Sequence, residues 1–163
     1  MILVAIRIVV LVAFVILIAC GIGLFVMAGV AQSHDVVRIP APNGTFISGD
    51  DPHANYTDAY IAPLGYSGFR DIGRVAEQAF YRGDKEIYRD DGEVTYQGTV
   101  AGMFHYKMSY LLAKDQSPQT LTVVSSITLA EGKKARYLWV VAKPIHRHLI
   151  PYLLDRMVIM APD

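Results

Sequence analysis

The stretch MFHYKMSYLLA, residues 103–113, alternates large apolar side chains with smaller or polar ones. The stretch TLTVVSSITLA, residues 120–130, has the same period of two. Because successive side chains of a β-strand point to opposite faces, both stretches predict strands, and we expect the second to be half-buried. One face of the first strand would carry Phe104, Tyr106, Met108, Tyr110 and Leu112, with His105, Lys107 and Ser109 opposite.

Further strands are predicted on both sides of this pair. Tyr and Thr residues favour a strand over Asn55–Ala62. Glu86–Arg89 and Glu93–Val100 flank Asp90-Asp91-Gly92, which predicts a hairpin with positive φ at Gly92. A last strand is expected over Arg136–Lys143, with Tyr137, Trp139 and Val141 on one face. The short connections favour an antiparallel meander.

Two helices complete the expected domain. Apolar residues at helical spacing predict an amphipathic helix over Phe69–Arg82. A terminal helix is predicted to begin at Pro144, since proline suits the first helical turn. Its apolar stripe would contain Ile145, Leu149, Ile150, Leu153, Leu154 and Met157, with Arg147, His148, Pro151 and Asp155 facing solvent. The expected fold class is α+β, a curved antiparallel sheet packed on a C-terminal helix, the helix-grip arrangement.

The segment Ile8–Ala31 contains no charged residue. Its length of about 24 residues exceeds the roughly 20 that span a bilayer, which predicts a transmembrane signal anchor. Two alternatives are open: a lipoprotein signal ending at Cys20, and cleavage after Ala31. The amino terminus and Arg7 precede the segment and only Arg38 follows it closely, so we expect a single-pass protein whose domain is extracytoplasmic.

The rest of the chain divides into a linker over residues 32–53, rich in Pro, Gly and Asp, and one domain over residues 54–163. With 15 basic and 15 acidic residues the formal charge is zero, which argues against a nucleic-acid partner. Cys20 is the only cysteine, so a disulfide within one chain is excluded. No cofactor-binding, catalytic or metal-binding motif is recognised, and no cofactor is expected.

The segment Arg136–Arg147, RYLWVVAKPIHR, followed by Ile150 and Leu154, resembles the closing signature of an uncharacterised bacterial domain-of-unknown-function family. That family also occurs fused behind NmrA-like NAD(P)-binding domains. Asp58-Ala59-Tyr60 and residues 104–109 resemble its early and middle strands, although an acidic residue is expected in place of His105 and glycine in place of Ala135. The resemblance covers about Ala54–Val158. It implies a START-like ligand-binding fold and no known reaction.

Aromatic and polar residues on the expected sheet and helix are the candidate ligand contacts: Tyr60, Phe104, Tyr106, Met108, Tyr110, Arg136, Trp139 and His146. His146 stands out because the family motif carries it, although packing or capping at the start of a helix would also explain it. His146 and His148 would point about 200° apart on a helix, so they could not share a metal ion there.

Three functions are consistent with these features. The first is a membrane-anchored domain that binds an apolar or amphipathic small molecule, or lipid. The second is a structural or interaction module whose partner is another envelope protein, and the third is a hydrolase- or cyclase-like enzyme using His146 or His105. A cavity of several hundred Å³ would favour the first, and a large exposed apolar patch the second. Polar groups with perturbed pKa values in a cleft would favour the third.

Overall fold

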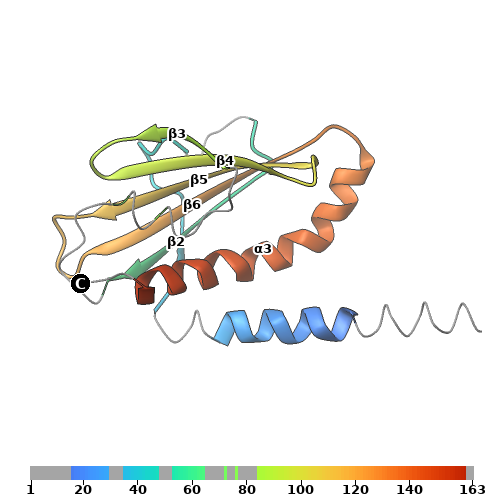
Figure 1. Ribbon diagram of the computed structural model, residues 1–163, viewed down its shortest axis with the longest axis horizontal. Coiled ribbons are helices and arrows are strands. Elements are labelled where there is room, and N and C mark those ends of the chain that lie inside the picture. The colour runs from blue at the N-terminus through green and yellow to red at the C-terminus, as the bar shows by residue number, and fades with distance from the viewer. Residues whose placement is uncertain are drawn as a thin grey trace, which may run out of the picture.

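The computed structural model describes residues 16–29, 35–47, 53–64, 72, 76 and 84–160, and the structural statements below concern these residues. They form an antiparallel sheet and a long C-terminal helix that lies along one face of it (Figure 1). The fold class is therefore α+β, as predicted. The elements are β1 (Val37–Ile39), β2 (Tyr56–Pro63), β3 (Lys85–Arg89), β4 (Glu93–Val100), β5 (Phe104–Ala113), β6 (Thr120–Leu129) and α3 (Lys133–Met160).

The six strands have the order β1-β2-β6-β5-β4-β3, and every neighbouring pair is antiparallel. β3 to β6 form the predicted meander, and β6 then pairs along its other side with β2. The predicted strands within residues 55–130 are confirmed to within a residue or two. β1 was not predicted and lies in the range that we expected to be a linker. β3 contains a bulge between Glu86 and Tyr88.

The strand predicted over Arg136–Lys143 is wrong, because these residues belong to α3. Tyr, Trp and Val favour strands, but β6 already has β5 on one side and β2 on the other. The residues that follow β6 consequently have no free strand edge beside them and cannot extend the meander. The helix begins at Lys133, so Pro144 is an interior residue and not the first one.

α3 also differs from the prediction in its buried face. Ile150, Leu154 and Met157 are buried as expected, but Asp155 and Pro151, which were predicted to face solvent, are buried too. Prolines within a helix lack the backbone N–H of one intrahelical bond and bend it. Pro144 and Pro151 both lie inside α3, and the helix changes direction along its length (Figure 1). A straight-helix projection from Pro144 therefore assigned Pro151 and Asp155 to the wrong face.

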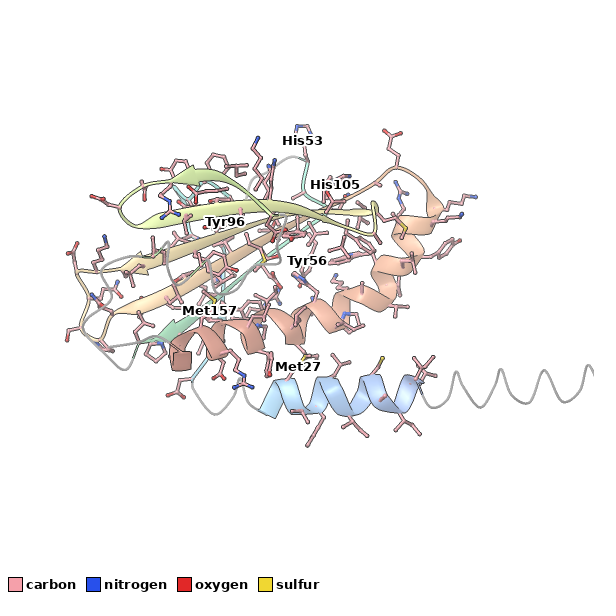
Figure 2. All side chains as sticks on the ribbon, in the orientation of Figure 1. Met27, His53, Tyr56, Tyr96, His105 and Met157 are labelled. Carbon is pink, nitrogen blue, oxygen red and sulfur yellow. The ribbon has the colours of Figure 1, made fainter. Side chains whose placement is uncertain are left out.

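The main core lies between the sheet and α3. It joins residues from β2, β4, β5 and β6 to the carboxyl half of α3 and to Ile72 and Ala76. Both of these are buried and helical, and they are the described part of the helix predicted over Phe69–Arg82. Figure 2 shows Tyr56 in the space between the sheet and α3, whereas His53 lies away from α3.

A second, smaller core covers the other face of the sheet. Ile47 packs there against Ala59 and Val124, with Ile39, Ala41 and Leu111 around them. The buried carboxylate of Glu93 accepts hydrogen bonds from the Phe46 backbone N–H at 3.0 and 3.2 Å, which ties this segment to β4. β6 is therefore buried on both faces, and the prediction that it is half-buried is wrong.

The hairpin between β3 and β4 forms as predicted, but its turn differs. Gly92 does not have the positive φ that we expected. The Asp90 carboxylate instead accepts hydrogen bonds from the backbone N–H groups of Gly92 at 2.8 Å and Glu93 at 2.6 Å. An aspartate that bonds the backbone two or three residues ahead holds a turn without a left-handed glycine.

Residues 16–29 are helical and apolar, and most of their side chains are exposed. Within the described ranges, no helix is both long enough and apolar enough to cross a membrane. The first residues of the predicted transmembrane segment Ile8–Ala31 lie outside those ranges.

Candidate functional site

A cavity of about 300 Å³ lies between the sheet and the middle of α3. Its wall is mostly apolar and comes mainly from β5, β6 and α3. The lining residues are Phe104, Tyr106 and Met108 on β5, Ser125 and Ile127 on β6, and Trp139, Ala142, Ile145, His146, Leu149, Ile150 and Leu153 on α3, with Asp84 and Val100 completing the wall. Since ligand sites begin at about 300 Å³ and are largely apolar with a few polar groups, the cavity has the size and character of a small one.

A polar cluster adjoins this cavity where α3 crosses β2 and β6. Asp58 is almost fully buried, and its Oδ2 accepts hydrogen bonds from the hydroxyls of Tyr56 at 3.0 Å and Tyr60 at 3.2 Å. The other oxygen, Oδ1, lies 3.4 Å from Nε2 of His146. That nitrogen is also 3.1 Å from the Ser125 hydroxyl oxygen. The cluster joins β2, β6 and α3 through one buried carboxylate.

The cluster contains a serine, a histidine and an aspartate, but its geometry differs from that of a catalytic triad. In a triad the serine and the aspartate contact different ring nitrogens, so that the histidine can take the serine proton. Here Ser125 and Asp58 approach the same atom, Nε2 of His146. A carboxylate can only accept, so its proximity favours the tautomer with a proton on Nε2. In that tautomer His146 donates to Ser125 and cannot deprotonate it, so the arrangement favours a structural link over nucleophilic catalysis.

Arg147 and Tyr56 extend this link to the surface of α3. Nε of Arg147 donates to the Tyr56 hydroxyl at 3.0 Å, and that hydroxyl donates in turn to Asp58. Burial raises the pKa of Tyr56, while the hydrogen bond from Arg147 acts in the opposite direction. The pKa of Tyr60 is raised more strongly, first by burial and then by the negative charge of Asp58. Both phenols therefore remain protonated donors near neutral pH.

Aromatic rings surround the histidine. The rings of Tyr56 and Trp139 lie 5.7 and 5.8 Å from that of His146, and Phe104 lies 5.8 Å from Trp139. Nζ of Lys143 lies 4.9 Å from the centre of the Tyr56 ring, a cation–π distance. Trp139, the only tryptophan of the chain, is thus part of both the aromatic cluster and the cavity wall.

A second polar group in the cavity wall comes from Asp84 and Tyr106. The Tyr106 hydroxyl donates to Oδ1 of Asp84 at 2.5 Å. Oδ2 of Asp84 is buried and has no hydrogen-bond partner among the described residues. Gly98, opposite Tyr106 on β4, makes room for this pair, because a Cβ there would overlap both the phenol and the carboxylate. The wall therefore includes an acceptor that a ligand donor could use.

The structure brings some of the predicted ligand contacts together and separates others. Phe104, Tyr106, Met108, Trp139 and His146 line the cavity. Tyr60 does not line the cavity and is linked to it only through Asp58 and His146. Tyr110 lies fully buried in the core, where burial raises its pKa. Arg136 is exposed on the first turns of α3.

His105, the alternative enzymatic residue, is exposed on the opposite face of the sheet, where its Nδ1 lies 3.1 Å from the Thr99 hydroxyl. It therefore shares no site with His146. The described residues contain no group of three or more His, Cys, Asp or Glu side chains that could hold a metal ion.

Sequence reasoning did not select Asp58, Ser125 or Asp84 as site residues. Ser125 carries a signal that could have been used, since it is the one polar residue on the inward face of β6. Asp58 likewise interrupts a strand with an ionisable group between two tyrosines. Their proximity to His146 depends on the pairing of β2 with β6, Asp58 opposite Ser125, which no local pattern encodes.

The sequence matches no protein-family model, and a comparison with curated proteins finds no significant match.

Proposed function

We propose that this protein is a membrane-anchored domain that binds an apolar or amphipathic small molecule, or lipid, between its sheet and α3. The cavity of about 300 Å³ carries the proposal. Its volume lies at the lower end of the roughly 300–1,000 Å³ range of small-molecule pockets, so we expect a small ligand or one part of a larger one. The arrangement of a long helix across an antiparallel sheet is similar to the helix-grip fold, as the family resemblance of residues 54–158 implies.

The anchor is the second part of the proposal. We assign it to the apolar segment Ile8–Ala31, in keeping with the exposed apolar side chains of residues 16–29. A bilayer tether keeps the cavity close to a reservoir of lipidic molecules at high effective concentration. The single-pass arrangement with an extracytoplasmic domain follows from the charges that flank the segment.

The polar groups of the wall indicate the ligand chemistry. The Asp84 carboxylate can accept a hydrogen bond but would repel an anion. We therefore expect 1-decanol, with eleven non-hydrogen atoms, to bind better than decanoate.

The test uses the full chain in lipid nanodiscs and the fluorescence of Trp139. Saturable changes on titration with 1-decanol are expected for the wild type. Ala142→Phe, which would place a phenyl ring in the cavity, should strongly weaken them, whereas Val141→Phe on the exposed neighbouring position should not. Mass spectrometry of small molecules that copurify with these two variants provides a second measurement. Equal responses and equal copurified material for the two variants would contradict binding in this cavity.

A further inference from the structure

The amino half of α3 carries a second surface that the cavity does not use. Tyr137, Val140 and Val141 are 72%, 72% and 64% exposed, and Leu138 and Ile145 are exposed as well. Positions 137, 140, 141 and 144 lie close together on a helix, at spacings of three, four and seven residues. The exposed residues therefore form one continuous apolar face, which we call the outer face of α3.

Basic residues border this outer face. Arg136, Lys143 and Arg147 are seven and four residues apart, so they fall within about 20° of one stripe along the helix. Lys133 and Lys134 add two exposed cations at the first turn. Between residues 133 and 147 there is no acidic residue, although the whole chain has zero formal charge. An apolar face beside a cationic border is one feature of helices that lie in the membrane interface.

We propose that the outer face of α3 docks on a bilayer surface containing anionic lipids. The apolar side chains would enter the acyl boundary while the basic border contacts lipid phosphates. The inference rests on the proposed anchor, which holds the domain beside lipid, and on the charge complementarity between an anionic leaflet and the exposed side chains of Lys133, Lys134 and Arg136. Lys143 and Arg147 contact Tyr56 at the inner edge of the border and are not part of this charge complementarity. A protein partner would also cover an apolar face, but it would not require a segment with several cations and no acidic residue, as residues 133–147 have.

Docking of this half of α3 would place the cavity next to the lipid. Trp139, Ala142 and His146 line the cavity from the inner side of the same helical segment whose outer side carries Tyr137 and Val141. Ile145 belongs to both the cavity wall and the outer face of α3, since it lines the cavity and is 37% exposed. A lipidic ligand would thus have a short path between the bilayer and the cavity, past Ile145 at the edge of α3.

The experiment places an environment-sensitive NBD fluorophore on single cysteines of the full chain in vesicles that contain nitroxide-labelled lipids. Cys20 is the native position and reports on the anchor. In a Cys20→Ser background, Val140→Cys reports on the outer face of α3, and His105→Cys on the opposite side of the sheet is the control. The vesicles contain phosphatidylcholine alone or with phosphatidylglycerol.

Docking predicts that the probe at position 140 is quenched in vesicles with phosphatidylglycerol and less in phosphatidylcholine alone, whereas the probe at position 105 is not quenched. Adding Lys134→Glu and Arg136→Glu should lower the quenching at position 140 without changing that at Cys20. A probe at position 140 that is unquenched while Cys20 is quenched would overturn docking and leave the anchor intact. Quenching at position 140 without quenching at Cys20 would support docking and contradict the anchor. Shielding of position 140 from iodide without lipid quenching would indicate a protein partner and overturn the proposal.

Discussion

The carboxyl half of α3 buries Ile150, Leu154 and Met157 against the sheet, whereas the amino half leaves Tyr137, Val140 and Val141 exposed. Both halves are rich in apolar residues and belong to one continuous helix. The difference shows that apolar content alone does not identify the packed part of a helix. The carboxyl half packs into the core, whereas the amino half covers a cavity and leaves its outer side exposed.

The largest effect is expected from truncation in the carboxyl half. Leu154 is fully buried, so Leu154→Ala should lower the free energy of unfolding by about 2–5 kcal/mol through lost contacts and a residual cavity. Val140→Ala in the amino half should change it by less than about 0.5 kcal/mol. Chemical denaturation of the full chain in nanodiscs measures both. Similar losses of unfolding free energy in the two variants would contradict the proposed difference in packing between the two halves of α3.

The Asp58 cluster joins the middle of α3, where its two halves meet, to β2 and β6, and its removal should have the next largest effect. Asp58→Ala leaves the hydroxyls of Tyr56 and Tyr60 without their carboxylate acceptor, which should cost about 1–3 kcal/mol. His146→Ala should cost about 1 kcal/mol, because it removes the hydrogen bond to Ser125. The same denaturation curves provide the comparison. A His146→Ala variant of unchanged stability that has lost turnover of an ester or lipid panel would instead support the enzymatic alternative.

Alkaline pH should weaken the same junction. The pKa of Tyr60 lies above its ordinary value of 10.0 in the folded protein, so above that pH the unfolded chain loses a proton that the folded chain keeps. Stability from this residue is therefore present below pH 10.0 and falls as the pH rises further. Tyr60→Phe should reduce the alkaline loss, measured as the shift in unfolding midpoint between neutral and alkaline pH. The exposed Tyr137→Phe serves as control, and an equal reduction in both variants would count against Tyr60.

The smallest effect on stability is expected on the outer face of α3. Replacing Tyr137 and Val141 together by serine should leave the unfolding midpoint almost unchanged, because neither side chain is packed. The same variant should weaken quenching of the probe at position 140 by membrane lipids. A large loss of stability would show that this face packs within the protein.

The strands could be predicted because their side-chain patterns and the turns between them are visible in the local sequence, as in Phe104–Ala113 and Glu93–Val100. The start of α3 could not be predicted, because residues 136–143 are rich in strand-forming side chains and place Tyr137, Trp139 and Val141 at alternate positions. This pattern is typical of a strand, although the residues are helical. Only the pairing of β6 with β2 excludes a strand there, and that pairing joins residues far apart in sequence. Phe104 and Met108 of the cavity wall followed from the alternation in β5, whereas Trp139 was predicted on a strand and instead reaches the wall from α3. The positions of Asp58, Ser125 and Asp84 depended on tertiary pairing.

The two outermost strands bear on whether copies of this protein can associate through their sheets. β1 has three residues, and β3 has five, with a bulge and the charged side chains of Lys85, Glu86 and Arg89. Short, bulged or charged border strands resist the addition of a foreign strand to a sheet. A high local concentration of copies should therefore not lead to sheet-to-sheet aggregation.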